Sequence, residues 1–278
     1  PLTDGRNVYA YFGSEGFYAF DYDGKLLWKF DPGPIKTIGM GPGTSPVMDA
    51  ERIFLQCDNG EENKSYLVAL DKKTGKTQWR VERPVNLTWS TPLFFDGALV
   101  TAATEKVIAY DPKTGKQLWA APGVKGNSVP SPVSGDGVVV VSAGYPEKFA
   151  SAFGPGGKAL WSYVKGTAYV PSPIFYGSYV YLITDKGLLT CIDSKTGEVK
   201  YEGKRPPVPA TFAGSPVAYD GKILITSEDG DSFVIKAGPE HAVLHSNSID
   251  EPVLSSPALS NGMLFLRGKS HLFAIAAQ

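Results

Sequence analysis

The chain has 278 residues, with 27 Lys and Arg against 28 Asp and Glu, so its formal net charge is −1. A near-neutral chain has no net field to attract nucleic acid or an anionic membrane, which argues against both as partners. No run of about eighteen apolar residues occurs, so no helical membrane span is predicted. The 31 Gly and 22 Pro are typical of a chain with frequent turns, and 14 Tyr, 14 Phe and 5 Trp can build a large core.

One hairpin pattern recurs along the whole sequence. It is clearest in residues 67–79, LVALDKKTGKTQW, and returns in 106–119 as KVIAYDPKTGKQLW. Shorter or altered copies occupy 18–28, 151–161 and 189–201. Each copy has an alternating apolar run, a Gly-containing turn and a short run that ends in an aromatic residue, which predicts a strand, a tight turn and a return strand. A hairpin that repeats about every forty residues is typical of a propeller blade or a solenoid rung.

A small residue followed by Pro marks the start of a further strand in each repeat. Proline suits a first-strand position because no ladder N–H is needed there. The segment from Pro1 is similar to the segment from Pro216, so Pro1 counts as a further copy. Successive copies lie 40 to 46 residues apart, at Pro1, Pro46, Pro92, Pro132, Pro173, Pro216 and Pro257. Seven markers predict seven blades.

We therefore predict an all-β fold, a single seven-bladed β-propeller with four antiparallel strands, A to D, in each blade. The blades are expected in chain order near 1–30, 46–83, 92–121, 132–164, 173–204, 216–246 and 257–278. The last blade ends after its third strand, so it is incomplete at the C-terminus. Because propellers remove open edges by pairing strands from the two ends, we expect residues upstream of Pro1 to supply the missing strand.

The pattern A-x-D-x-x-x-G-K-x-x-W resembles the tryptophan-docking repeat of PQQ-like, or quinoprotein-like, β-propellers. We predict a structural role, with each Trp ring between neighbouring blades where the small Ala leaves it room. In the fifth blade Cys191 replaces the Ala and Tyr201 replaces the Trp. The predicted repeat residues are Ala19, Asp21, Gly24, Trp28, Ala69, Asp71, Gly75, Trp79, Ala109, Asp111, Gly115, Trp119, Gly157, Trp161, Gly197 and Tyr201.

Two branches of that family differ in what the resemblance implies. The quinone-dependent dehydrogenases usually have eight blades, a vicinal Cys-Cys pair and a bound calcium, whereas this chain has seven markers and only Cys57 and Cys191, far apart. The seven-bladed branch resembles the outer-membrane β-barrel assembly lipoprotein B family and other exported PQQ-like repeat proteins. Those are scaffolds without a cofactor. The resemblance therefore implies a periplasmic or secreted binding protein in which neither PQQ nor another cofactor is expected.

The loops from strand D to strand A and from strand B to strand C are expected to surround one mouth of the propeller channel. The loop at 32–44 is long and rich in Gly and Pro, and both a functional loop and a plain spacer remain open for it. Acidic and basic side chains mix in these loops, which favours a polar ligand or a peptide over a polyanion. The candidate ligand-face residues are Lys36, Asp58, Trp89, Tyr169, Asp185, Asp229, Arg267 and His271.

Two of these candidates carry alternative interpretations. Trp89 lies outside the docking repeat, and its ring is expected either to stack on a ligand or to pack under the loop at 32–44. His271 has the chemistry of a general base but no Ser or Asp partner at a recognisable spacing, so no catalytic residue is assigned. The acidic loops 58–62 and 228–231 can be read as calcium sites or as solvated turns, and no metal site is predicted.

The functional prediction is a non-catalytic binding or scaffold propeller, monomeric, whose partner is a protein, a peptide or a small polar ligand. The alternative is an enzyme with its site at the channel mouth, either similar to a lyase or lactonase or a PQQ-dependent oxidoreductase. Polar side chains that converge on one point would favour the enzyme.

Overall fold

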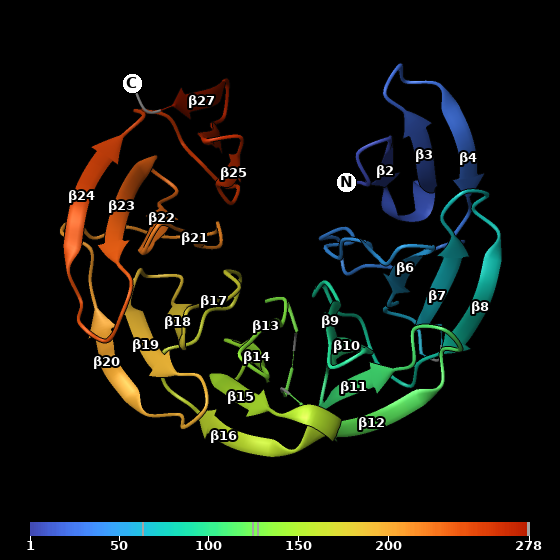
Figure 1. The fold of residues 1–278 in the computed structure, drawn as a ribbon, viewed down its shortest axis with the longest axis horizontal. Helices are drawn as coiled ribbons and strands as arrows, with labels where there is room; N and C mark the ends of the chain where they lie inside the picture. Colours follow the sequence, from blue (N-terminus) through green and yellow to red (C-terminus); the bar gives the residue numbers. More distant parts are fainter. Residues whose placement is uncertain (63, 124, 127, 277–278) are drawn as a thin grey trace. The chain divides into compact units, whose positions relative to one another are not determined.

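The computed structural model describes residues 1–62, 64–123, 125–126 and 128–276, and its regular structure is almost entirely β-strand (Figure 1). The exceptions among these residues are two short 3-10 turns, η1 (Gly13–Glu15) and η2 (Pro155–Gly157). The chain forms two compact units, Pro1–Pro132 and Val133–Gln278. None of the described residues belong to a helix long and apolar enough to cross a membrane.

The first unit holds three antiparallel sheets of four strands, and in each sheet neighbouring strands are consecutive in the chain. The strands of blade one are β1 (Leu2–Thr3), β2 (Asn7–Tyr11), β3 (Phe17–Asp21) and β4 (Leu26–Phe30). Those of blade two are β5 (Val47–Met48), β6 (Arg52–Cys57), β7 (Tyr66–Asp71) and β8 (Thr77–Glu82). Those of blade three are β9 (Leu93–Phe95), β10 (Ala98–Ala103), β11 (Lys106–Tyr110) and β12 (Gln117–Pro122).

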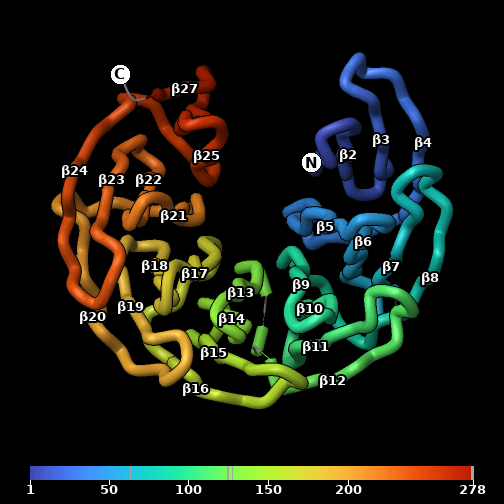
Figure 2. The backbone as a smooth tube through the Cα atoms, viewed as in Figure 1, coloured from blue at the N-terminus to red at the C-terminus, as the bar shows by residue number. Residues whose placement is uncertain are grey.

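The second unit holds three further sheets of four strands and one of three, with the same up-and-down order, which Figure 2 traces as a tube. The strands of blade four are β13 (Val133–Gly135), β14 (Val138–Ala143), β15 (Phe149–Phe153) and β16 (Ala159–Tyr163). Blade five has β17 (Ile174–Tyr176), β18 (Tyr179–Ile183), β19 (Leu189–Asp193) and β20 (Val199–Lys204). Blade six has β21 (Val217–Tyr219), β22 (Lys222–Thr226), β23 (Asp231–Lys236) and β24 (Val243–Ser248). Blade seven has β25 (Ala258–Ser260), β26 (Met263–Arg267) and β27 (Leu272–Ala276).

These seven sheets confirm the predicted seven-bladed β-propeller, including a last blade of three strands. Strand A of a blade begins directly after the marker proline, as β5 does after Pro46, β9 after Pro92 and β13 after Pro132. The last residues of the range expected for blade seven, 277–278, lie outside the described residues.

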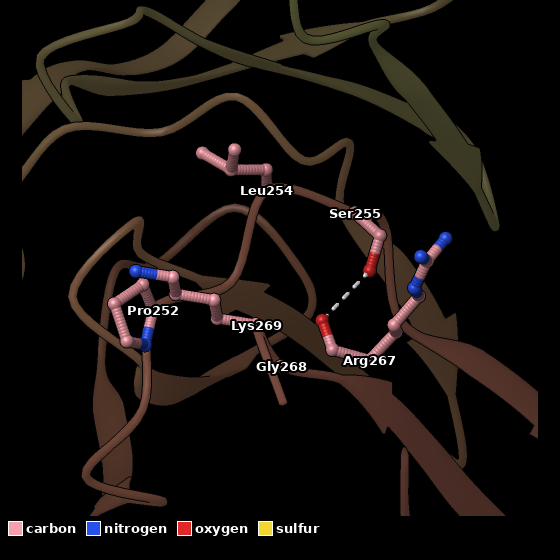
Figure 3. Close-up of a pocket in the computed structure, with 6 residues that line it drawn as sticks. All are labelled: Pro252, Leu254, Ser255, Arg267, Gly268 and Lys269. Carbon is pink, nitrogen blue, oxygen red and sulfur yellow. Dashed lines mark hydrogen bonds between the residues drawn. The ribbon is translucent and has the colours of Figure 1, made fainter. Parts of the chain in front are cut away.

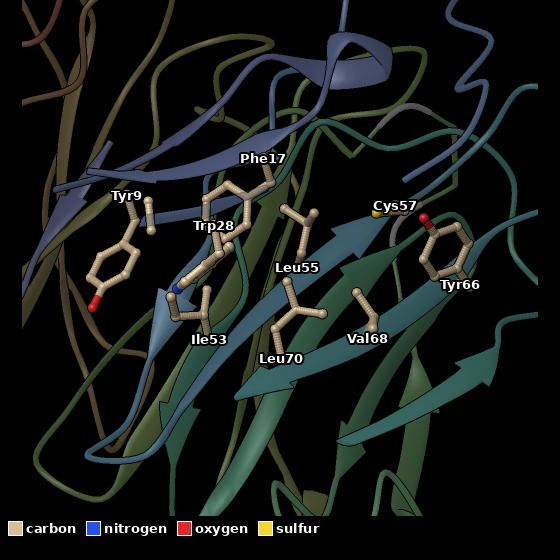
Figure 4. Packing of buried hydrophobic residues seen from close by; sticks show 10 residues of the cluster. Tyr9, Phe17, Trp28, Ile53, Leu55, Cys57, Tyr66, Val68 and Leu70 are labelled. Atoms are coloured by element: carbon tan, nitrogen blue, oxygen red, sulfur yellow. The ribbon is translucent and has the colours of Figure 1, made fainter. Parts of the chain in front are cut away.

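The middle strands of each blade form the core. In blade two, β6 is buried from Ile53 to Cys57 and β7 from Tyr66 to Leu70, whereas the fourth strand β8 is half-buried or exposed. Figure 4 shows the reason: side chains of blade one, such as Phe17 and Trp28, pack against blade two within the first unit. A strand covered by sheets on both faces needs apolar residues at every position, not only at alternate ones.

The indole rings of the repeat lie against the next blade along the chain. The indole N–H of Trp28 donates to the Lys72 carbonyl at 3.2 Å, that of Trp79 to Pro112 at 3.0 Å and that of Trp161 to Ser194 at 2.7 Å. Each acceptor lies in the turn between strands C and D of the following blade. A Cβ added to Gly75 in that turn would lie 2.5 Å from the Trp28 ring, so only Gly leaves room for the indole.

The other repeat residues shape the hairpin that receives the ring. Ala69 and Trp79 are direct cross-strand partners, and so are Ala19 and Trp28, Ala109 and Trp119, and Cys191 and Tyr201. The Asp residues accept backbone N–H groups of their own turns: Asp71 from Thr74 at 2.8 Å, Asp111 from Lys113 at 2.7 Å and Asp21 from Lys25 at 2.9 Å. Gly24, Gly75, Gly115, Gly157 and Gly197 have φ between +69° and +81°, a region that favours Gly.

A second set of contacts joins the blades at the marker prolines. The backbone N–H of the residue before Pro donates to the hydroxyl of the equivalent residue in the next blade. In the first unit, Ser45 donates to Thr91 and Thr91 to Ser131, each at 2.9 Å. In the second unit, Ser172 donates to Ser215 and Ser215 to Ser256, also at 2.9 Å. The small residue of the sequence marker is therefore a hydroxyl acceptor between blades.

Candidate functional site

The loop at 32–44 in the first unit is held in place by blade two along its first half. The Tyr66 hydroxyl donates to the Pro32 carbonyl at 2.5 Å, and the Asn59 side-chain amide donates to the Pro34 carbonyl at 2.9 Å. The backbone N–H of Gly60 donates to the Lys36 carbonyl at 2.8 Å. Because three of its carbonyls accept hydrogen bonds from blade two, this long loop has a defined conformation.

The second half of the loop rests on Trp89. The indole N–H of Trp89 donates to the Gly41 carbonyl at 2.9 Å, and a Cβ added to Gly43 would lie 2.7 Å from the ring. Only 8% of Trp89 is exposed. The ring therefore lies beneath the loop at 32–44 and supports it from below.

The 32–44 loop exposes apolar side chains above this support. Ile38 is 65% exposed and Met40 is 67% exposed. Phe12, 60% exposed, lies on a neighbouring turn whose Gly13 is so close to Pro42 that an added Cβ would lie 2.6 Å away. A hollow of about 240 Å³ borders Ile38 and is lined in part by Asn86, Leu87 and Trp89. We call Phe12, Ile38 and Met40 the apolar loop patch.

Lys36 forms an ion pair with Glu61 at the edge of the 32–44 loop. Both side chains are largely exposed, and the hydrogen bond from Lys36 lowers the pKa of Glu61. The predicted ligand-face residue Lys36 is thus placed on the surface, within the same loop as the apolar loop patch.

Asp58 lies in the interior of the first unit. Its carboxylate accepts a hydrogen bond from Arg83 Nη1 at 2.7 Å, and the side chains of both residues are at most 1% exposed. The Thr88 hydroxyl donates to the other carboxylate oxygen. Burial raises the pKa of Asp58, and the charge of the Arg83 guanidinium opposes that rise.

The buried pair is the centre of a polar network that spans the base of the loops. Arg83 Nη2 donates to the Thr101 hydroxyl at 3.1 Å, and the Gln56 side-chain amide donates to the Thr88 hydroxyl at 2.8 Å. The network thereby joins β6, the segment directly after β8, β10 and the segment that carries Trp89. Buried ions need such partners, so the network fixes the loop base instead of presenting a free charge to a ligand.

Two other predicted residues meet in the second unit. The Asp185 carboxylate accepts the backbone N–H of Tyr169 at 2.9 Å and that of Val170 at 3.1 Å. The carboxylate thus orders the loop that precedes blade five. Asp229 is exposed in the turn between β22 and β23.

A carboxylate and an imidazole meet at the loops of blade seven. Glu251 Oε2 lies 2.8 Å from His271 Nδ1, and Glu251 Oε1 accepts the backbone N–H of His271 at 3.0 Å and that of Ser270. The hydrogen bonds from Ser270 and His271 lower the pKa of Glu251. In the described part of the chain the imidazole has no hydroxyl or thiol partner, so the pair lacks the nucleophile of a catalytic triad.

A hollow of about 420 Å³ lies beside this pair (Figure 3). Its lining combines Pro252, Leu254 and Ser255 from the loop before β25 with Arg267 at the end of β26 and Gly268 and Lys269 from the loop after it. The Ser255 hydroxyl donates to the Arg267 carbonyl at 3.3 Å, which ties the two loops together. The predicted residues Arg267, at the end of β26, and His271, directly before β27, therefore flank one short loop that carries Lys269.

The possible metal ligands and the cysteines of this chain differ from those of quinone-dependent dehydrogenases. Over residues 1–62, 64–123, 125–126 and 128–276, no group of three or more His, Cys, Asp and Glu could hold a metal ion. Cys57 and Cys191 are free, buried thiols in different units. This donor set does not fit the calcium and vicinal cysteines of a quinone-dependent dehydrogenase.

Arg83 is not among the site residues that the sequence predicts, because the repeat pattern marks it only as the end of blade two. A signal was present: Trp79, Val81, Arg83 and Val85 alternate along β8 and beyond it, and alternate residues of a strand share a face. Arg83 is therefore carried on the same face as the docking Trp, toward the interior, where it is 1% exposed.

Comparisons with known proteins agree with this architecture. The family profile described as outer membrane protein assembly factor BamB matches residues 1–202. No curated protein matches the sequence. The crystal structure of BamB from Moraxella catarrhalis is similar to this chain with a TM-score of 0.56 and 14% identity, over 99% of this chain and 94% of that one.

Enzymes have similar structures too. A europium-containing methanol dehydrogenase is similar with a TM-score of 0.68 and 13% identity, over 95% of this chain and 71% of that one. A quinohemoprotein alcohol dehydrogenase from Comamonas testosteroni is similar with a TM-score of 0.60 and 16% identity, over 77% of this chain and 43% of that one. At such identities the likeness indicates the fold alone.

Proposed function

Because this chain belongs to the family of the outer membrane protein assembly factor BamB, we propose that it is a non-catalytic scaffold that binds a protein partner during outer-membrane protein assembly. The proposal places the protein in the periplasm and requires neither a quinone nor a metal ion.

One observation of this chain carries the proposal: Ile38 and Met40 of the apolar loop patch are exposed on a loop whose backbone is held by hydrogen bonds. Ile38 and Met40 are about two-thirds exposed, although the loop that bears them is anchored by Asn59, Tyr66 and Trp89. Exposed apolar groups that lie close together are typical of protein interaction sites. An ordered loop also loses little conformational entropy when a partner binds, which favours affinity.

The test is to place charges on the apolar loop patch and to compare it with an exposed apolar residue elsewhere. The double variant Ile38→Asp with Met40→Asp should lower the amount of folded outer-membrane protein in cells that carry it in place of the wild-type chain. Loss of a central interface contact costs about 2 kcal/mol or more, so binding should weaken by about thirtyfold or more. Leu118→Asp, at a residue 52% exposed on β12, is the matched control and should behave as wild type.

Circular dichroism of the purified variants shows whether both chains fold. The proposal fails if the folded double variant supports assembly as well as the Leu118→Asp variant does.

A further inference from the structure

One wall of the hollow in blade seven is fastened to blade six. The backbone N–H of Val253 donates to the Glu228 carbonyl at 3.0 Å, and that of Ile249 donates to the Gly230 carbonyl at 3.3 Å. Val253 is 1% exposed, so this segment is anchored by its own buried side chain as well. The segment that carries Pro252 and Leu254 is therefore positioned before any ligand arrives.

The opposite wall is fastened by Glu251. Its carboxylate accepts the backbone N–H groups of Ser270 and His271, which fixes the loop that follows Arg267 and carries Lys269. A Cβ added to Gly268 would lie 2.7 Å from the Glu251 carboxyl group, so the close approach of the two walls depends on that Gly. Both walls are thus ordered by contacts outside the hollow.

The lining of the hollow presents two positive charges without ion-pair partners and one exposed apolar side chain. Within the described residues, neither Arg267 nor Lys269 has an ion-pair partner, and Leu254 is 70% exposed. Figure 3 shows the two cationic side chains leaving the loop in opposite directions, with Leu254 across from them. The net charge of the whole chain is −1, so these cations form a local site for negative charge and not part of a general basic surface.

We infer that this hollow binds an extended segment of a partner protein in which an apolar residue lies between two acidic ones. The inference rests on the proposed function, because the occupant is a protein. Alternate residues of an extended chain face the same side, so acidic, apolar and acidic residues at alternate positions would face Arg267, Leu254 and Lys269 together. Complementary charges at the two ends would set the register of the segment, and the apolar contact would add affinity.

The experiment uses a synthetic peptide with both ends blocked and the central order Asp-Ser-Leu-Ser-Asp. Binding to the full chain is measured by isothermal titration calorimetry at low salt. Wild type should bind this peptide. Arg267→Glu and Lys269→Glu should each weaken binding by about five- to tenfold, because each replaces a partly exposed attraction to one Asp of the peptide with a repulsion. Lys158→Glu is the matched control, since Lys158 is an exposed lysine on blade four, and it should change binding by less than about twofold.

Further arms identify what is bound. A peptide with Lys in place of both Asp residues should not bind, and a peptide with Ser in place of Leu should bind more weakly. Equal binding to Lys269→Glu and to wild type would overturn the inference, and so would full competition by glutarate, which would make the hollow a site for small carboxylates. If a charge-reversed variant does not fold, Arg267→Ala or Lys269→Ala replaces it with the same expected direction. None of these results depends on the apolar loop patch, so failure here is separate from failure of the proposed function.

Discussion

Blades two and seven both fix their loops with a carboxylate that faces a nitrogen group, but they do so at different depths. In blade two the side chains of Arg83 and Asp58 are 0% and 1% exposed. In blade seven those of His271 and Glu251 are 73% and 12% exposed. If one partner of the buried pair is lost, no water can solvate the charge that remains. In the exposed pair, solvent screens the attraction between the two side chains and can solvate either of them. The comparison shows that burial decides how much such a pair contributes to stability. The buried pair should contribute strongly, and the exposed pair should contribute weakly and in a way that depends on pH.

The largest effect is expected from breaking the buried pair. Asp58→Asn leaves the Arg83 charge in the interior without a counter-charge, which should lower the free energy of unfolding by about 3–5 kcal/mol. Urea denaturation followed by circular dichroism measures the loss. Asp229→Asn is the control, because Asp229 is an exposed acid in the corresponding loop of blade six. If Asp58→Asn lowers the free energy of unfolding no more than the control does, the buried network does not stabilise the fold.

An intermediate effect is expected at the turn of blade two that receives the Trp28 ring. The described residues of blade seven form three strands and include no turn between a third and a fourth. Gly75→Ala and Gly97→Ala both place Ala at positive φ, +69° and +73°, which costs roughly 1–2 kcal/mol in each. Only at Gly75 would the new Cβ meet a ring, at 2.5 Å from Trp28, whereas nothing lies within 4 Å of it at Gly97.

Gly75→Ala should therefore lose about 1–3 kcal/mol more than Gly97→Ala in the same urea experiment. Equal losses would mean that the indole ring moves aside without cost and that docking does not depend on the Gly.

The smallest effect is expected at the exposed pair, and it should depend on pH. The pKa of Glu251 is lowered from its ordinary value of 4.5 by hydrogen bonds from Ser270 and His271. A lowered carboxyl pKa contributes stability that is present above the ordinary pKa and is lost as the pH falls through the lowered one. Wild type should therefore unfold at a higher temperature than Glu251→Gln at neutral pH, and the difference should disappear on acidification. A difference that stays constant with pH would assign the effect to packing instead of charge.

The blades could be predicted from the sequence because their boundaries are set locally. A proline such as Pro46 cannot donate to a ladder, and a residue such as Gly75 can adopt positive φ, so each marks its position without reference to the rest of the fold. The family resemblance depends on the same local residues. Nothing in the hairpin pattern, however, indicates that the small residue before Pro accepts a hydrogen bond from the preceding blade.

The candidate sites could be predicted only in part. The sequence places Arg267 in the loop between strands B and C of blade seven and His271 at the start of strand C. The contact of His271 with Glu251 depends instead on the close approach that Gly268 permits. Asp58 was assigned to the ligand face because it follows a strand, yet Arg83, 25 residues away, binds its carboxylate in the interior. Contacts between side chains this far apart arise from packing, which a period in the sequence does not encode.

The hydroxyl groups beside the marker prolines have a consequence for how such a chain can evolve. Each of the four links described above runs in one direction, from an amide of one blade to a hydroxyl of the next, at the same length in both units. A duplicated blade would bring its own donor and its own acceptor, so a copy inserted between two blades would find both neighbours already compatible. Gain or loss of a whole repeat then requires no new kind of hydrogen bond between neighbouring blades. Relatives with different numbers of sheets can therefore share the same contacts between blades.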